Sequence, residues 1–463
     1  MNPEGPCPHG PGMCERFIAG SGPSGDGPSG FAYGLSPYNL PKSPPFSISC
    51  CGLSVGGSIL GKGMSTFPTL ADVEAARERL APHLSVTPVS HAVSISEALG
   101  KQITIKWDSK LRTGSFKERG ALNFLLSLDP AVRERGVCTA SAGNHALGVS
   151  YHAQRLGIPC EIVVPTNAPL VKIERCRKLG AKISYQGSLA EAMVYAQNLA
   201  KESDITYVPP FDHENIVQGH GVAALELLHQ VPDFDSIVIP IGGGGYAAGV
   251  AATLKQKRPD IFVLGVMSEW AQRIRENPDA YKPGFAPMTI ADGIAVKQIG
   301  KVTGPILDRF VDKIVATPET SIAHAIMMLL EHERAVVEGA GAAALAAVMD
   351  GHLPDRCKRP VVFVCGSNID MNLLSRLIEQ DMCERGRLLR VNISLPDRPG
   401  MLHRITGIIA EQGGNVLQVA HDRFYARLPG HVDITVIVEV RDRAHGAQIV
   451  KHLNEAGLQS QAV

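Results

Sequence analysis

The sequence predicts an α/β protein with a second, smaller α/β domain at its C-terminal end. From residue 137 the chain passes repeatedly from a short apolar run through a glycine-bearing turn into a helical pattern, which is typical of largely parallel strands. After residue 385 the composition changes, and the pattern βαββαβ follows within about 75 residues. A chain of 463 residues, 44% of them hydrophobic, is long enough for two or three domains.

Residues 1–63 differ from the rest of the chain. They are rich in Gly, Pro and Ser, contain four cysteines, and show neither helical nor strand periodicity, so we interpret them as a disordered extension. The group Cys7, His9 and Cys14 could bind a metal, but incidental thiols in a flexible tail explain it more simply. Met64 is therefore a candidate start of the functional chain.

The next region, residues 64–384, is expected to form the main α/β unit, with a smaller subdomain at about 136–213 inserted in it. A capping pattern at Thr69 predicts a helix from Leu70. The predicted strands are Gln102–Trp107, Val137–Ala140, Cys160–Val164, Lys182–Tyr185, Ser236–Pro240 and Val361–Val364. In the C-terminal domain, residues 386–463, we predict strands at Leu389–Leu395, Val416–Ala420 and Val432–Val440, and helices at Met401–Glu411 and near Ala444–Asn454.

Lys117 lies in a segment that predicts the start of a helix. Small residues precede it, a hydroxyl from the segment Thr113 to Ser115 is expected to cap the helix, and an apolar helical pattern continues to Leu126. A lysine whose pKa is lowered by partial burial and nearby positive potential is an amine nucleophile at neutral pH. A solvated surface lysine is the alternative.

Two strand ends carry further candidates for a ligand site. The strand Ser236–Pro240 is followed by Gly242, Gly243, Gly244 and Gly245, which would place backbone amides and a helix N-terminus against an anion such as a phosphate. A tight packing turn or a dinucleotide loop are the alternatives. The strand Val361–Val364 ends at Cys365, again at a carboxyl edge where ligands of α/β proteins bind.

Charge and cysteine usage exclude several classes of partner. Lys plus Arg and Asp plus Glu both total 45, so nothing indicates binding to nucleic acid or to an anionic membrane, and small metabolites are the expected ligands. No apolar run has the length of a membrane span, and no signal peptide is recognisable. The ten cysteines show no zinc-like spacing, which favours a reducing, cytoplasmic setting.

From about Met64 to its end, the chain resembles the ACT-domain-containing threonine dehydratases, which belong to the second fold type of pyridoxal-phosphate (PLP) enzymes, the type of the tryptophan synthase β subunit. The motif at residues 115–121, Ser-Phe-Lys-Glu-Arg-Gly-Ala, implies that Lys117 is the Schiff-base lysine and that Phe116 flanks the pyridine ring. The Gly242–Gly245 run would hold the phosphate, and Gly293 would pack under the other face of the ring. The loop from Glu338 to Gly341 resembles one near the same pocket.

The resemblance also implies a substrate loop. Its residues, Ser141, Ala142, Gly143, Asn144 and His145, would bind the substrate carboxylate, and Asn144 would reach the ring hydroxyl. Racemase relatives have a serine at the place of Ala142, and a methyl group carries no proton for the opposite ring face. Elimination is therefore expected rather than racemisation.

Three further positions are informative. Cys365 stands where most relatives have serine facing the ring nitrogen, and either group leaves that nitrogen unprotonated. The glutamate that begins a racemase-type metal site is replaced by Met267, so we expect no metal unless Glu269 substitutes for it. His220 replaces the commoner glutamine, and we expect it to be a hydrogen-bonded histidine beside the site.

The resemblance implies a PLP-dependent lyase that converts L-threonine, and also L-serine, to a 2-oxo acid and ammonia. Serine racemisation and hydroxyaspartate dehydration are alternatives within this class, and a non-catalytic amino-acid sensor is an alternative outside it. An amino-acid effector is expected at the C-terminal ACT domain near Asp397 to Leu402. A homo-oligomer, either dimer or tetramer, is expected as well.

Overall fold

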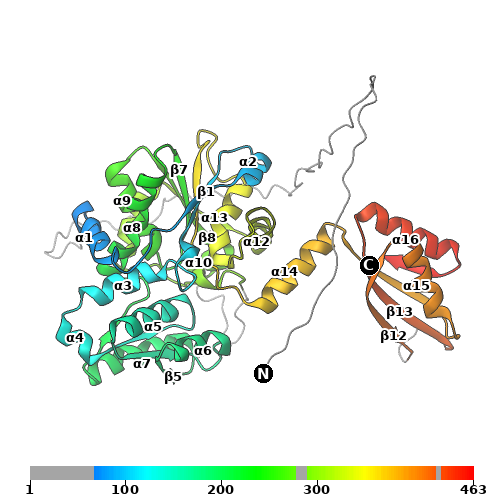
Figure 1. The fold of residues 1–463 in the computed structure, drawn as a ribbon, viewed down its shortest axis with the longest axis horizontal. Coiled ribbons are helices and arrows are strands. Elements are labelled where there is room, and N and C mark those ends of the chain that lie inside the picture. Colours follow the sequence, from blue (N-terminus) through cyan, green and yellow to red (C-terminus); the bar gives the residue numbers. More distant parts are fainter. Residues whose placement is uncertain (1–66, 278–288, 424–428, 463) are drawn as a thin grey trace, which may run out of the picture. The chain divides into compact units, whose positions relative to one another are not determined.

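The computed structural model describes residues 67–277, 289–423 and 429–462 (Figure 1). The predicted disordered extension, residues 1–63, lies outside the described residues. The described residues have the mixed α/β fold that the sequence predicts. We refer to residues 67–384 as the main region and to residues 386–462 as the C-terminal domain.

The main region alternates helices and strands along most of its length. Its strands are β1 (Val89–His91), β2 (Thr104–Trp107), β3 (Val137–Ala140), β4 (Cys160–Val164), β5 (Lys182–Tyr185), β6 (Thr206–Tyr207), β7 (Ser236–Pro240), β8 (Phe262–Ser268), β9 (Lys313–Thr317) and β10 (Pro360–Val364). Its α-helices are α1 (Leu70–Leu80), α2 (Val93–Leu99), α3 (Lys117–Ser127), α4 (Pro130–Arg135), α5 (Asn144–Leu156), α6 (Leu170–Lys178), α7 (Leu189–Glu202), α8 (Glu214–Gln230), α9 (Gly245–Lys257), α10 (Glu269–Glu276), α11 (Thr303–Phe310), α12 (Glu319–Glu333), α13 (Gly339–Met349) and α14 (Met371–Glu384). The described residues of the main region also form two short 3-10 helices, η1 (Asp108–Lys110) and η3 (Asp292–Ile294).

A six-stranded sheet forms the centre of the main region, with the strand order β1-β2-β10-β7-β8-β9. Only the edge strand β1 runs antiparallel to its neighbour. Alternate residues of the central strands face opposite sides, so Val238 and Val362 pack towards α12 and α13 while Ile237 and Val361 pack towards α8 and α9. Figure 1 shows these two helix pairs on either side of the sheet.

A second sheet, with the order β5-β4-β3-β6, is parallel throughout and is formed by residues 137–207. Helices α5, α6 and α7 pack on it, and two apolar clusters fill its two sides. The carboxyl end of β3 leads directly into the predicted substrate loop, and the carboxyl ends of β7 and β10 lead into the glycine loop and Cys365. Both sheets therefore present several of the predicted site residues at strand ends.

The C-terminal domain consists of β11 (Leu388–Pro396), α15 (Met401–Glu411), β12 (Asn415–Asp422), β13 (His431–Glu439), α16 (Arg443–Glu455) and β14 (Gln459–Ala462). This is the predicted βαββαβ order, in an antiparallel sheet with the strand order β12-β13-β11-β14. In β13 every second residue from Val432 to Val438 is buried, and these side chains form one core with Ile405 and Ile449 of the two helices.

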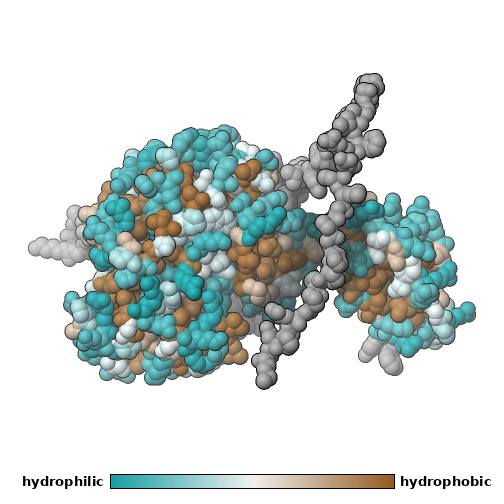
Figure 2. Space-filling view, in the orientation of Figure 1, coloured by the Kyte–Doolittle hydropathy of each residue, from teal (hydrophilic) through white to brown (hydrophobic). Residues whose placement is uncertain are grey.

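On the face that Figure 2 shows, hydrophilic residues surround separate patches of apolar residues. Among the helices of the described ranges, we find none with the length and apolar character that crossing a membrane requires.

Candidate active site

Lys117 is the first residue of α3, as the sequence predicts, but the expected hydroxyl cap is wrong. Phe116 occupies the capping position with helical backbone angles, and no side chain caps the helix. The reason is that Ser115 pairs as a β-bridge with Gly366, which fixes its backbone against the end of β10. The hydroxyls of Thr113 and Ser115 are buried and have no hydrogen-bond partner among the described residues.

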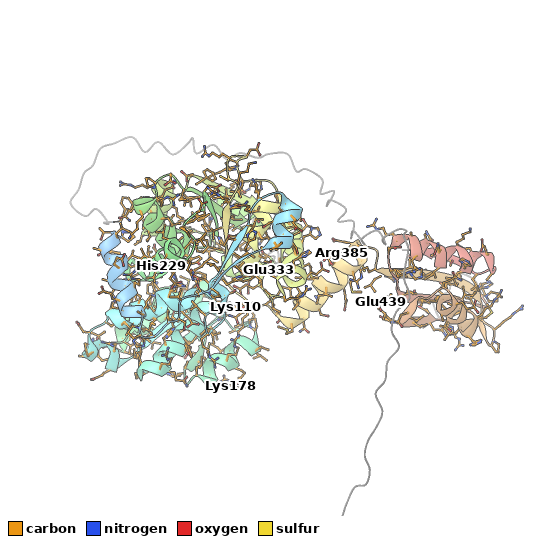
Figure 3. The ribbon with its side chains drawn as sticks, turned by 45° about the horizontal axis from the view of Figure 1, so that its top comes forward. Lys110, Lys178, His229, Glu333, Arg385 and Glu439 are labelled. Carbon is orange, nitrogen blue, oxygen red and sulfur yellow. The ribbon has the colours of Figure 1, made fainter. Side chains whose placement is uncertain are left out.

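The amine of Lys117 is held without a carboxylate partner. Its Nζ donates a hydrogen bond to the carbonyl oxygen of Pro210 (2.8 Å) and lies 5.0 Å from the centre of the Phe116 ring. Lys117 is half-buried, and burial of its amine lowers its pKa to about 8, although Cys365 and Glu338 oppose this shift. Lys110, labelled in Figure 3, belongs to the same segment but is exposed.

The four glycines lie where β7 passes into α9, and the loop leaves little room for side chains. Gly244 has a φ of +99°, which favours glycine, and a Cβ atom there would lie 2.8 Å from the Thr303 hydroxyl. A Cβ on Gly243 would lie 2.4 Å from the ring of Phe211. Thr303 also donates to the Gly243 carbonyl (2.7 Å), which fixes the loop at the N-terminus of α9, where amides without helical partners attract an anion.

The predicted substrate loop leads into α5. Asn144 is its first helical residue, Gly143 precedes it as the capping residue, and the Gly143 amide donates to the Ser141 hydroxyl (3.2 Å). No side chain caps α5, so its first amides are available to a carboxylate. Ala142 is half-buried against the apolar cluster of the smaller sheet.

His145, the last residue of the predicted substrate loop, is buried. Its Nε2 lies 3.1 Å from the carbonyl oxygen of Val208. Burial, assisted by the nearby charge of Lys117, lowers the pKa of His145 to about 3. His145 is therefore a neutral side chain at pH 7 and adds no positive charge to the site.

Glu338 is a site residue whose role the sequence did not reveal. Its Oε1 accepts a hydrogen bond from Asn144 Nδ2 (2.7 Å), and Asn144 Oδ1 accepts one from Asn368 Nδ2 (2.8 Å). Burial, with a further contribution from Asp292, raises the pKa of Glu338 to about 7. Asn144 and Glu338 are 194 positions apart, so no local sequence pattern could have paired them.

Cys365 contacts the segment that carries Lys117, and Gly293 lies next to Gly242 and near Glu338. The Cys365 thiol is buried, and burial raises its pKa, so it is a neutral thiol. The carbonyl of Cys365 accepts from the Phe116 amide (3.0 Å). A Cβ atom on Gly293 would lie 3.5 Å from Glu338 Oε1, and one on Gly242 would lie 3.3 Å from the Gly293 carbonyl.

Phe116 has an aromatic support on the side of α8 and α9. Its ring stacks on Tyr246 with 4.2 Å between ring centres, and the His220 ring lies 4.9 Å away. The expectation of a hydrogen-bonded His220 is wrong, because both of its ring nitrogens are buried without a partner. Burial lowers the pKa of His220 well below its ordinary value, so a neutral ring packs among these aromatic groups.

A buried ionic cluster connects Tyr246 to α3, whose first residue is Lys117; we call residues 111–121 the lysine segment. Arg119 donates to both oxygens of Asp108 (2.9 Å each) and to both oxygens of Glu226 (2.7 Å each). Lys106 pairs with Glu226 (2.7 Å), and the Tyr246 hydroxyl donates to Asp108 (2.7 Å). Two cations and two anions balance, and the cluster fixes α3 two residues after Lys117.

Met267 and Glu269, the two residues considered for a metal site from the sequence, both contact arginine side chains. Glu269 pairs with Arg273 of its own helix, and the sulfur of Met267 contacts Arg275. In the ranges that the structure describes, no three His, Cys, Asp or Glu side chains are grouped as metal ligands.

Comparison with known proteins identifies the family of the chain. A family model described as pyridoxal-phosphate-dependent enzyme matches residues 80–366, and an ACT domain model matches residues 389–457. An L-threonine ammonia-lyase of Thermotoga maritima is 36% identical over 409 residues, which cover 85% of this chain and 99% of that protein. The L-threonine ammonia-lyase of Geobacter sulfurreducens is also 36% identical, over 83% of this chain and 97% of its own length.

Solved structures of the same kind are similar to the main region. Maize serine racemase has a TM-score of 0.63 and 31% identity, covering 69% of this chain and 99% of the racemase. The processed form of threonine deaminase isoform 2 from Solanum lycopersicum has a TM-score of 0.62 and 32% identity, covering 67% of this chain and 86% of the deaminase.

Proposed function

Because the chain belongs to the family of pyridoxal-phosphate-dependent enzymes and carries an ACT domain, we propose that it is a threonine ammonia-lyase. The reaction converts L-threonine to 2-oxobutanoate and ammonia, and L-serine would give pyruvate and ammonia in the same way. Two L-threonine ammonia-lyases that match over most of their length support this substrate class.

The observation that carries the proposal is the environment of Lys117. A half-buried ammonium group whose only hydrogen bond in the described residues goes to the Pro210 carbonyl costs free energy, and its pKa of about 8 makes the neutral amine accessible near pH 7. A neutral amine at a helix start is suited to nucleophilic and base chemistry.

The residues of the site fit pyridoxal phosphate. The Gly242–Gly245 loop would hold the phosphate, Phe116 and Gly293 would flank the ring, and the neutral thiol of Cys365 would face the ring nitrogen. When bound, this cofactor holds the substrate amino group and makes the α-proton acidic. The amine of Lys117 would then take that proton.

The substrate carboxylate would bind at the start of α5. The free amides from Asn144 onward and the hydroxyl of Ser141 supply donors, while the neutral His145 avoids a fixed charge there. Asn144 would orient the ring hydroxyl, and its bonds to Glu338 and Asn368 hold its amide in place. These two partners would keep Asn144 from rotating between turnovers.

Ala142 distinguishes elimination from racemisation, which matters because serine racemases are among the similar structures. Racemisation needs a proton donor on the ring face opposite Lys117, and the Ala142 methyl group supplies none. Loss of the β-hydroxyl is therefore the expected outcome.

The described cysteines, six in all, are free thiols, which supports a reducing compartment such as the cytoplasm.

In the ACT domain, we propose that an amino-acid effector binds at residues 397–402. Gly400, with a φ of +87°, turns the chain from β11 into α15, and Asp397 pairs with Arg423 at the surface.

The exposed edge strand β12 offers unpaired backbone groups to a second copy, which supports a homo-oligomer, either dimer or tetramer.

The experiment that tests the function is a substrate comparison. Purified protein loaded with pyridoxal phosphate is incubated separately with L-threonine, L-serine and 3-hydroxyaspartate, and 2-oxo acid and D-serine are both measured. We expect 2-oxobutanoate from L-threonine as the fastest product and negligible D-serine. D-serine formation at a rate comparable to pyruvate formation would contradict the proposal. Ala142→Ser should introduce measurable racemisation.

A further inference from the structure

Arg275, near the end of α10, is a half-buried arginine that contacts the glycine loop from behind. Its Nη2 donates to the carbonyl oxygen of Gly242 (2.8 Å) and to that of Val296 (3.1 Å), and its Nη1 contacts the Met267 sulfur of β8. Its Nε is buried without a partner. The guanidinium group thus ties the first residue of the loop to two other parts of the main region.

The charge of Arg275 has no carboxylate counterpart among the described residues. Among the described residues no carboxylate lies within 4.0 Å of it, whereas the exposed Arg273 of the same helix pairs with Glu269 and the buried Arg119 pairs with two carboxylates. Burial lowers the pKa of Arg275, as expected for a cation that lacks a partner. A guanidinium group withdrawn from water without an anion is costly, so an anion is expected nearby.

The nearest feature built to attract an anion is the glycine loop that Arg275 contacts. We propose that Arg275 is a positioning residue for the cofactor phosphate, which fixes the Gly242 carbonyl and supplies the positive charge that balances the phosphate. This inference rests on the proposed role of the Gly242–Gly245 loop.

Arg275 also bears on the metal position considered from the sequence. Since the guanidinium group contacts Met267, it would repel a metal cation bound beside Met267, and Mg²⁺ or a chelator should leave cofactor binding unchanged.

The test compares two cofactor forms that differ only in the phosphate. Cofactor-free protein is titrated with pyridoxal phosphate and with pyridoxal, and binding is followed by visible absorbance, which does not depend on turnover. We expect Arg275→Gln to weaken pyridoxal phosphate binding by about tenfold or more, as for loss of a hydrogen bond to a charged group, and to change pyridoxal binding by less than about twofold. Arg275→Lys, which keeps the charge, should retain more of the preference for the phosphate.

Arg273→Gln is the matched control, because it removes the same charge from the same helix at a site exposed to water. It should leave both affinities unchanged. If Arg275→Gln weakens both forms equally, or neither, Arg275 has no role toward the phosphate. If Arg275→Gln does not fold, Arg275→Lys decides: a retained preference for the phosphate supports the proposal, and a lost preference overturns it. A wild type that shows no preference at all would instead refute the proposed role of the glycine loop.

Discussion

Replacing Asp108 with asparagine should destabilise the main region, because Asp108 is a fully buried partner of Arg119. Burial alone would raise the pKa of Asp108, but Arg119, Lys106 and the hydrogen bonds to Asp108 outweigh it and lower the pKa to about 2. The difference from the ordinary value of 3.8 corresponds to about 2 kcal/mol of stability at neutral pH. Removing one partner of a buried ion pair costs about 3 to 5 kcal/mol in general.

Glu226 still pairs with Arg119 in this variant, so we expect Asp108→Asn to lower the free energy of unfolding by about 2 to 3 kcal/mol at pH 7. This free energy is measured by urea unfolding, monitored by circular dichroism. The matched control is Asp260→Asn, which breaks an exposed pair with Arg258 and should change stability by less than about 1 kcal/mol.

The pH dependence gives a second readout with a definite sign. Since the pKa of Asp108 is lower in the folded protein, its contribution is present above about pH 3.8 and is lost as the pH falls towards 2. The difference between wild type and Asp108→Asn should therefore shrink over that range. If the variant unfolds at the same urea concentration as wild type at pH 7, the cluster does not stabilise the lysine segment and this reasoning is wrong.

Three further predictions concern the site and the ACT domain. Cys365→Ser should keep substantial activity, whereas Cys365→Asp should lose most of it because a carboxylate beside the ring nitrogen would stabilise its protonated form. Steady-state rates with L-threonine decide this, and a faster aspartate variant would contradict it. The pKa of Glu338 is raised to about 7 in the folded protein, so cofactor-free wild type should lose about 3 kcal/mol of stability as the pH rises from 4.5 to 7. Melting curves over this pH range should show that Glu338→Gln lacks this loss. Calorimetry should detect an amino acid bound to the ACT domain, and Asp397→Ala should weaken that binding; no heat with any amino acid would count against an effector site there.

Local sequence patterns were sufficient for the parts of the site that lie next to strand and helix ends. Lys117 at the start of α3, the glycine loop after β7 and Cys365 after β10 all follow from the alternation of apolar strands, glycine turns and helices. The βαββαβ order of the C-terminal domain followed from the same periodicity, because buried and exposed residues alternate regularly in β13.

The remaining features depend on contacts between distant residues. Glu338 reaches Asn144 across 194 positions, and Arg275 reaches Gly242 across 33, so neither pairing has a local signal. The hydroxyl cap at α3 was predicted from composition, but the bridge from Ser115 to Gly366 determines the backbone there. His220 is an aromatic packing group rather than a hydrogen-bonding one, which depends on Phe116 and Tyr246 lying beside it.

The most direct test of the central claim compares Lys117→Ala with Lys110→Ala. Both substitutions remove a lysine amine from the same segment, but the Lys110 side chain is exposed and lies beside the Trp107 ring (5.8 Å). Each variant is loaded with pyridoxal phosphate, and 2-oxobutanoate formation from L-threonine is measured together with the visible absorbance of the bound cofactor. We predict that Lys117→Ala forms no 2-oxobutanoate above the uncatalysed rate and loses that absorbance, while Lys110→Ala retains both. Turnover by Lys117→Ala within about tenfold of wild type would contradict the assignment of Lys117 as the amine that anchors the cofactor and moves the proton.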